Sequence, residues 1–464
     1  MESTVMKSRI SHGLKAIPVL IAVLLTLLTG CKNSDPAALP IGMFDSGTGG
    51  LTVLEQFLAM DSFNNTTGEE NPDGLPDFEG ENFVYLADQA NMPYGVYSSK
   101  NKTDYLKELI INDAKFLTTG KNSSKVVVIA CNTATAYGLK DVEEMLFKSG
   151  KGVRVIGVID AGVDGALSTI TQADKVSEES IAVGVMATIG TIASGGYENT
   201  IQRLAKERGF KGEMKVVNQG GLGFAEAIDS ETDYISKEAT ETRDNYRGPR
   251  YGDSTGIDPQ LMDIYNFDTS GNSLLVKKDE TGKITDIQLN STGNYARFHM
   301  VSLIEKHRKT NPGVKLKSII LGCTHYPYLI DTIMKVEQEL RAKEIEGEFP
   351  YKAAMDSAIK YIDPAVNTAK ETYRLLMAMN LLKKGKDVTK VSPFISVPAK
   401  NIDSKHLDNR GNFTFEFKYG REIGSGISTV DVVPFSKSNI NQENIKRIGE
   451  RLPLSYSLIK SNLE

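Results

Sequence analysis

Val126–Thr135, V-V-V-I-A-C-N-T-A-T, decides the expected fold of this chain, together with its counterpart Ser318–Tyr328, S-I-I-L-G-C-T-H-Y-P-Y. Each stretch begins with a run of aliphatic, mostly β-branched residues, which is typical of a buried parallel strand. Each run ends on a cysteine, Cys131 or Cys323. Ligands of open α/β sheets bind beyond the carboxyl ends of the strands, so both thiols are expected at a functional site.

Small and hydroxylated residues follow each cysteine, where the chain is expected to turn into a helix. After Cys131, Asn132 or Thr133 can cap a helix that runs through Leu146. A helix N-terminus lowers the pKa of a nearby thiol and raises its thiolate fraction. The sequence therefore predicts a lowered pKa for Cys131.

The rest of the chain alternates between β-branched runs and helical patterns, which indicates a parallel, doubly wound α/β architecture. Further strands are expected within 41–54, 83–88, 153–158, 181–187, 215–229, 358–362, 394–397 and 412–419. Helices are expected at 104–117, 294–307 and 441–451, with a long one within 353–383. The polar stretch 230–293 interrupts this pattern and is interpreted as an insertion that could carry a β-hairpin from 273–277 and 284–289.

The glycine-rich segment Ile41–Leu54, I-G-M-F-D-S-G-T-G-G-L-T-V-L, joins a short strand to the start of a helix. Its glycines would let backbone N–H groups approach an anion. Neither a Walker lysine nor the glycine spacing of a dinucleotide site is present. From the residues alone, a functional loop and a plain tight turn are both open.

The first thirty residues have the features of an export signal. Basic side chains precede an apolar run, 16–28, which is short for a membrane span and has the length of a signal-peptide core. Leu28–Cys31, L-T-G-C, resembles the bacterial lipobox, whose cysteine is acylated. We therefore expect a lipoprotein signal peptide at 1–30, acylation of Cys31, a tether at 31–40 and anchoring to a lipid bilayer in the cell envelope. An ordinary signal peptide is the alternative.

Composition argues against several classes of protein. Without residues 1–30 the chain loses three basic side chains and one acidic one, so its formal charge changes from −5 to −7. No basic patch interleaved with aromatic residues stands out, so no nucleic-acid partner is expected. The chain has only three cysteines, which argues against a disulfide scaffold. Roughly 430 residues suffice for a substantial core and for two or more domains.

Six short motifs occur in a characteristic order: F-D-S-G-T-G-G-L-T-V-L (44–54), P-Y-G (93–95), A-C-N-T-A (130–134), A-T-I-G-T (187–191), L-G-C-T-H-Y-P (321–327) and Y-I-D-P-A (361–365). With these motifs the chain resembles the glutamate racemases of the cofactor-independent aspartate/glutamate racemase superfamily. The resemblance spans most of 41–382. The insertion, the tail after about residue 383 and the lipoprotein signal are atypical of that family, whose usual role is cytosolic supply of D-glutamate for the cell wall.

The resemblance implies that Cys131 and Cys323 are the two acid/base catalysts. Removing the Cα proton of an amino acid and returning one to the opposite face requires two bases, and a thiol/thiolate pair suits this task. We expect Asp45 to assist Cys131 and His325 to assist Cys323. A substrate held between the thiols should keep their Cα atoms more than about 7 Å apart, so both cysteines are expected to stay reduced.

The resemblance also implies which residues contact the substrate: Asp45, Ser46, Tyr94, Gly95, Asn132, Thr133, Thr191, Thr324 and His325. The family places a further glutamate near the second cysteine. Asp229 is the nearest match here and is expected to join the catalytic group, with Glu226 as the other candidate.

The implied fold consists of two doubly wound parallel-sheet α/β domains in a pseudo-twofold arrangement, with the active site in the cleft between them. The first domain would comprise 41–155 and 346–464, and the second 156–345. The resemblance implies a small acidic amino acid as ligand, no cofactor, no metal and a homodimer, and the histidine in C-T-H-Y-P points to glutamate. The alternatives are a racemase of aspartate or another small substrate, or an inactive membrane-tethered amino-acid-binding protein.

Overall fold

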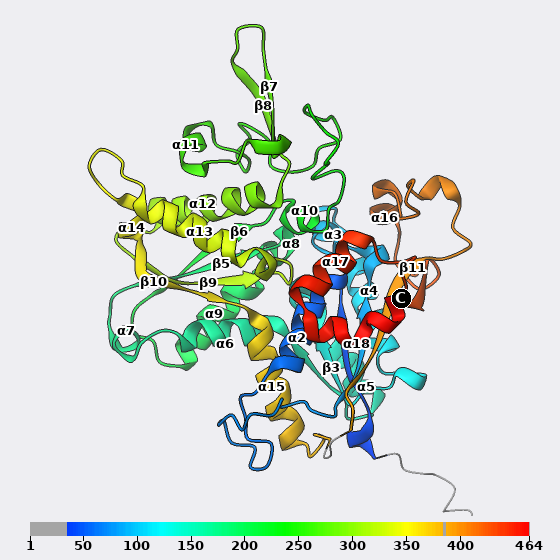
Figure 1. Ribbon diagram of the computed structural model, residues 1–464. Coiled ribbons are helices and arrows are strands. Elements are labelled where there is room, and N and C mark those ends of the chain that lie inside the picture. The colour runs from blue at the N-terminus through cyan, green and yellow to red at the C-terminus, as the bar shows by residue number, and fades with distance from the viewer. Residues whose placement is uncertain (1–34, 384–386, 464) are drawn as a thin grey trace, which may run out of the picture.

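The computed structural model describes residues 35–383 and 387–463. The expected signal peptide and Cys31 lie outside the described residues. Two separate β-sheets, each flanked by helices, form the body of the protein (Figure 1). This arrangement confirms the expected α/β fold with parallel sheets.

The first sheet has six strands in the order β12-β11-β2-β1-β3-β4. Their bounds are β1 Ile41–Asp45, β2 Asn82–Ala87, β3 Val126–Ile129, β4 Arg154–Gly157, β11 Lys390–Pro398 and β12 Val430–Pro434. All neighbours pair in parallel except β12, which runs antiparallel to β11. Strands β1 and β3 are buried along their whole length, as the uninterrupted apolar run of β3 predicts.

The second sheet has four strands in the order β10-β9-β5-β6, all parallel. Their bounds are β5 Ile181–Ala187, β6 Met214–Gly220, β9 Lys315–Gly322 and β10 Met355–Ile362. The described α-helices are α2 Leu51–Ala59, α3 Gly95–Ser99, α4 Thr103–Phe116, α5 Asn132–Ser149, α6 Val158–Ser168, α7 Gln172–Val176, α8 Ile189–Ala193, α9 Gly196–Glu207, α10 Phe224–Ile228, α11 Met262–Tyr265, α12 Thr292–Thr310, α13 Ile330–Ala342, α14 Pro350–Ala354, α15 Pro364–Ala378, α16 Phe415–Gly420, α17 Gln442–Arg451 and α18 Pro453–Leu463.

The expected boundary between 345 and 346 is wrong. It assigned residues 355–362 to the first unit, whereas β10 pairs with β9 of the second sheet. The chain returns once more to the second sheet through a parallel crossover. After β10 the chain forms α15, which packs against both α2 and α6, and then enters β11 of the first sheet. At the other expected boundary, β4 of the first sheet extends to Gly157, two residues beyond 155.

The insertion carries the expected β-hairpin, β7 Leu274–Lys278 with β8 Ile284–Leu289, which projects away from the body (Figure 1). The strand expected at 412–419 is wrong, because Phe415–Gly420 forms the helix α16. Thr414 caps this helix by accepting a hydrogen bond from the N–H of Phe417. Phe415, Phe417 and Tyr419 lie on this short helix. Strand β12 and helix α18 were not predicted.

No helix within residues 35–383 and 387–463 combines the length and the apolar character that crossing a membrane would require.

Candidate active site

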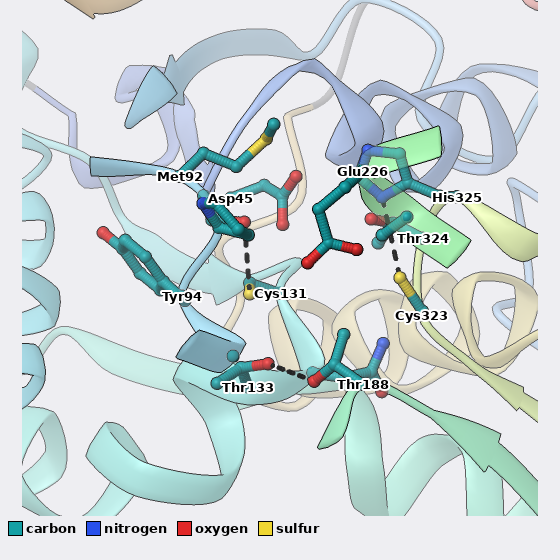
Figure 2. Close-up of a pocket in the computed structure, with 15 residues that line it drawn as sticks. Asp45, Met92, Tyr94, Cys131, Thr133, Thr188, Glu226, Cys323, Thr324 and His325 are labelled. Carbon is teal, nitrogen blue, oxygen red and sulfur yellow. Dashed lines mark hydrogen bonds between the residues drawn. The ribbon is translucent and has the colours of Figure 1, made fainter. Parts of the chain in front are cut away.

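One cavity takes its lining from both sheets (Figure 2). It is lined by Asp45, Ser46, Met92, Pro93, Tyr94, Gly95, Cys131, Asn132, Thr133, Thr188, Ala225, Glu226, Cys323, Thr324 and His325. The cavity volume is about 30 Å³. The carboxyl ends of β1 and β3 on one side, and of β5 and β9 on the other, deliver most of these residues. Both cysteines are buried and free, and they line the same cavity.

Cys131 occupies the N-cap position of α5. Its Sγ accepts a hydrogen bond from the N–H of Ala134 at 3.5 Å and donates one to Ser46 Oγ at 3.7 Å. The expected lowering of its pKa is wrong. Burial raises the pKa of the Cys131 thiol, the nearby charge of Asp45 raises it further, and the helix N–H only partly opposes both effects. Cys131 is therefore a thiol at neutral pH.

The glycine-rich turn after β1 holds the carboxylate of Asp45. The N–H groups of Gly50 and Gly47 donate to Asp45 Oδ2 at 2.8 and 3.2 Å. A Cβ on Gly50 would lie 2.4 Å from the Asp45 Cβ, so this close approach requires glycine. Burial raises the pKa of Asp45, and the charge of His325 and the two N–H groups oppose the rise. The turn is thus a tight loop whose N–H groups bind a carboxylate of the chain itself.

Cys323 begins a chain of contacts that leads away from the cavity. Its Sγ lies 3.6 Å from His325 Nδ1, and His325 Nε2 lies 2.9 Å from Asp229 Oδ2. Burial alone would lower the pKa of His325, but the charge and hydrogen bond of Asp229, with Cys323, hold it well above its ordinary value. His325 is therefore an imidazolium that donates to Asp229 from Nε2 and presents Nδ1–H to Cys323.

These contacts place each predicted site residue. Asp229 stands behind His325, bonded to it, and does not itself form part of the cavity lining described above. Thr191 likewise stands behind the lining and shares a 3.0 Å hydrogen bond with Thr133. The remaining residues that the sequence nominated as catalysts or substrate contacts line the cavity. Among the described residues, no group of three or more His, Cys, Asp or Glu side chains is placed to hold a metal ion.

Comparison with known proteins identifies the family. No protein-family model matches the chain. The glutamate racemase of Levilactobacillus brevis is 36% identical over 343 residues, which cover 74% of this chain and 80% of that relative. The chain belongs to the glutamate racemase family. Its members are isomerases that racemise amino acids, and the described chain is therefore a racemase.

Two further comparisons extend over most of the racemase. The glutamate racemase of Fusobacterium nucleatum subsp. nucleatum is 25% identical over 356 residues, 77% of this chain and 88% of that relative. A crystal structure of the glutamate racemase of Francisella tularensis, solved in complex with D-glutamate, is 21% identical and has a TM-score of 0.43. The match covers 83% of this chain and 95% of the Francisella tularensis chain.

A cluster of three threonine hydroxyls joins the two halves of the racemase site. Thr133 Oγ1 lies 2.9 Å from Thr188 Oγ1 and 3.0 Å from Thr191 Oγ1, and the latter two are 3.0 Å apart. Thr133 follows β3 of the first sheet, whereas Thr188 and Thr191 follow β5 of the second. Hydroxyl groups both donate and accept, so the cluster can exchange an internal hydrogen bond for one to a ligand.

Tyr94 contributes its ring to the cavity, while its hydroxyl points away. The Tyr94 hydroxyl lies 2.5 Å from Asp88 Oδ2 and 2.7 Å from Asp113 Oδ2. Burial raises the pKa of Asp113 well above its ordinary value, and the charge of Asp88 raises it further. A protonated Asp113 therefore lets all three groups share hydrogen bonds. Sequence reasoning missed Asp88 and Asp113, because a buried partner of a tyrosine hydroxyl has no local sequence pattern.

Glu226 points into the space between the two cysteines (Figure 2). Its Oε2 atom is buried and has no hydrogen-bond partner among the described residues. Burial raises the pKa of Glu226 to about 7. Both candidates for the family's glutamate therefore lie at the site in different positions: Asp229 contacts His325, and Glu226 lines the cavity.

Proposed function

We propose that this racemase interconverts L- and D-glutamate by a two-base mechanism in which Cys131 and Cys323 act on opposite faces of Cα. One observation carries the proposal: two buried thiols, one following a strand of each sheet, line the same small cavity. The names of the relatives favour glutamate as the substrate.

The surroundings of the two cysteines support complementary roles. The raised pKa of Cys131 keeps its proton on sulfur, which suits an acid. His325 Nδ1 lies 3.6 Å from Cys323 Sγ, where its positive charge can stabilise negative charge on that sulfur when Cys323 acts as the base. In one direction the Cys323 thiolate takes the Cα proton, the C–H electron pair moves toward the substrate carboxylate, and the Cys131 thiol gives its proton to the opposite face. The reverse direction exchanges these roles.

Neighbouring side chains supply groups for binding the amino acid. Ser46, Asn132, Thr133 and Thr324 line the cavity and can donate to a carboxylate, while Asp45 can accept from an ammonium group. Burial of the cavity strengthens each of these interactions, because it excludes water from the charge that develops on the substrate.

The decisive experiment follows the full chain with L-glutamate in deuterated water. We expect loss of the Cα proton signal and appearance of D-glutamate, both abolished in Cys131→Ser and Cys323→Ser. Aspartate in place of glutamate tests the alternative substrate. Binding of glutamate without exchange or inversion would instead support a binding protein and contradict the proposal.

We also propose that acylation of Cys31 anchors the racemase to a membrane of the cell envelope, where it would supply D-glutamate for the cell wall. The proposal rests on the L-T-G-C sequence alone, because these residues lie outside the described part of the chain. Mass spectrometry of the N-terminal peptide should find a lipid-modified Cys31, and Cys31→Ser should release the protein from membranes. An unmodified Cys31 would contradict the proposal. A homodimer stays a prediction, to be checked by light scattering.

A further inference from the structure

Arg447, near the end of the chain, contacts the far side of the Cys323 half of the site. It lies on α17, and its Nη2 atom donates to Asp229 Oδ1 at 2.5 Å. Its Nη1 atom donates to the backbone oxygen of Ile228. The guanidinium also lies over the ring of Tyr328, 5.2 Å from the centroid. All three contacts are to residues next to the site, and the Arg447 side chain is only 14% exposed.

The two oxygens of Asp229 have different partners. Oδ1 accepts from Arg447, while Oδ2 accepts from His325. A buried carboxylate is costly unless it is paired, and each of these partners supplies a positive charge. The guanidinium is always charged, and its two terminal nitrogens donate to different acceptors, Nη2 to Asp229 Oδ1 and Nη1 to the Ile228 carbonyl. With Oδ1 held by Arg447, Oδ2 faces His325 Nε2, and the opposite ring nitrogen, Nδ1, then lies toward Cys323.

We propose that Arg447 is a positioning residue of the racemase, which orients Asp229 so that His325 presents its Nδ1 atom to Cys323. This inference rests on the proposed two-thiol function and adds a member from the C-terminal tail, a region beyond the motifs of the family resemblance. Arg447 acts through Asp229 and His325 and leaves the Cys131 half untouched.

The C-terminal helices have a second attachment that does not involve Arg447. The N–H groups of Leu454 and Ser455, at the start of α18, donate to the carboxylate of Glu55 at 3.0 and 2.7 Å. Glu55 lies on α2, against which α18 packs. Substituting Arg447 therefore leaves α18 anchored, which allows a positioning role to be separated from a purely structural one.

The first test compares Arg447→Met and Arg447→Lys with a matched control on the same helix. Lys446→Met removes a cation whose side chain is 75% exposed. We expect Arg447→Met to lower kcat/KM for glutamate about 10- to 100-fold, a loss like that found when outer partners of metal-binding histidines are removed. Arg447→Lys keeps a cation near Asp229 and should recover part of the activity, whereas Lys446→Met should match the wild type. A full loss in Lys446→Met would assign the effect to α17 as a whole and overturn the inference.

The second test uses the isotope effect of each enantiomer deuterated at Cα. Because enantiomers have equal free energies in water, kcat/KM must fall by the same factor in both directions. The isotope effects need not change together. Arg447→Met slows proton transfer at Cys323. The deuterium isotope effect should therefore increase for the enantiomer whose proton Cys323 removes, and it should decrease for the other enantiomer. Equal changes in both would indicate general loosening of the site and contradict the inference.

A double-mutant cycle keeps the inference testable if Arg447→Met folds poorly. Asp229→Asn combined with Arg447→Met leaves no unpaired buried charge at this position. If Arg447 acts through Asp229, the double variant should be no less active than Asp229→Asn alone. Additive losses would overturn the inference while the racemase function stands. Absence of racemisation in the wild-type chain would instead contradict the proposed function itself.

Discussion

His325 Nε2 lies 2.9 Å from Asp229 Oδ2, and the two side chains are only 5% and 2% exposed. The pair connects the end of α10 to the loop after β9 and is closed to solvent. Its charge state therefore decides how His325 acts on Cys323, whose sulfur lies 3.6 Å from the other ring nitrogen.

Replacing His325 by asparagine removes the cation beside Cys323 while keeping a polar side chain. We predict that His325→Asn lowers kcat in both directions about 100-fold or more, the size of effect typical of an acid/base group. Stopped assays, with chiral separation of L- and D-glutamate, measure kcat in each direction. Wild-type turnover in both directions would exclude His325 from the mechanism.

We predict that the ion pair at Asp229 makes the free energy of unfolding depend on pH in the acid range. Burial alone would raise the pKa of Asp229, but the charges of His325 and Arg447 hold it below its ordinary value. The pair therefore stabilises the fold above the unfolded pKa of about 4, and this stabilisation is lost as the pH falls through the lower folded value. Urea unfolding between pH 7 and 3 should show a steeper loss of stability for the wild type than for Asp229→Asn. Equal slopes would contradict the assignment.

Glu226 should make substrate binding depend on pH near neutrality. Its raised pKa of about 7 leaves it neutral below that pH and anionic above it, and His325, Asp229 and Lys418 are the charged groups that act on it. An anionic Glu226 repels a substrate with two carboxylates. We predict that KM for glutamate rises between pH 6 and 8 in the wild type and stays flat in Glu226→Gln. A rise that persists in Glu226→Gln would assign the titration to another group.

Gly50→Ala should disturb Asp45. The added Cβ would lie 2.4 Å from the Asp45 Cβ and 2.9 Å from the Tyr85 hydroxyl. We expect a loss of roughly 1–3 kcal/mol in the free energy of unfolding, together with reduced turnover. Gly293→Ala is the matched control, because a Cβ at this position in α12 meets no atom within 4 Å. It should be neutral or slightly stabilising. Equal effects in both variants would contradict the role of Gly50.

The sequence predicted those parts of the structure that depend on local patterns. The buried runs before Cys131 and Cys323 form central strands of parallel sheets, and both thiols reach one cavity. The pKa of Cys131 was predicted with the wrong sign, because the charge of Asp45 and the degree of burial depend on the assembled fold. Arg447 could not be predicted, since it reaches Asp229 from 218 residues away in the chain.

The position of β11 has a consequence for synthesis of the chain. Strand β2, complete at Ala87, has β1 on one side, while its other neighbour, β11, begins only at Lys390. At ribosomal speeds of about 5–20 residues per second, that edge of β2 waits on the order of half a minute for its partner. Throughout that interval the nascent chain presents unpaired N–H and C=O groups that neighbouring chains can capture. Chaperone binding near the ribosome should therefore concentrate on this edge until the last sixth of the polypeptide emerges.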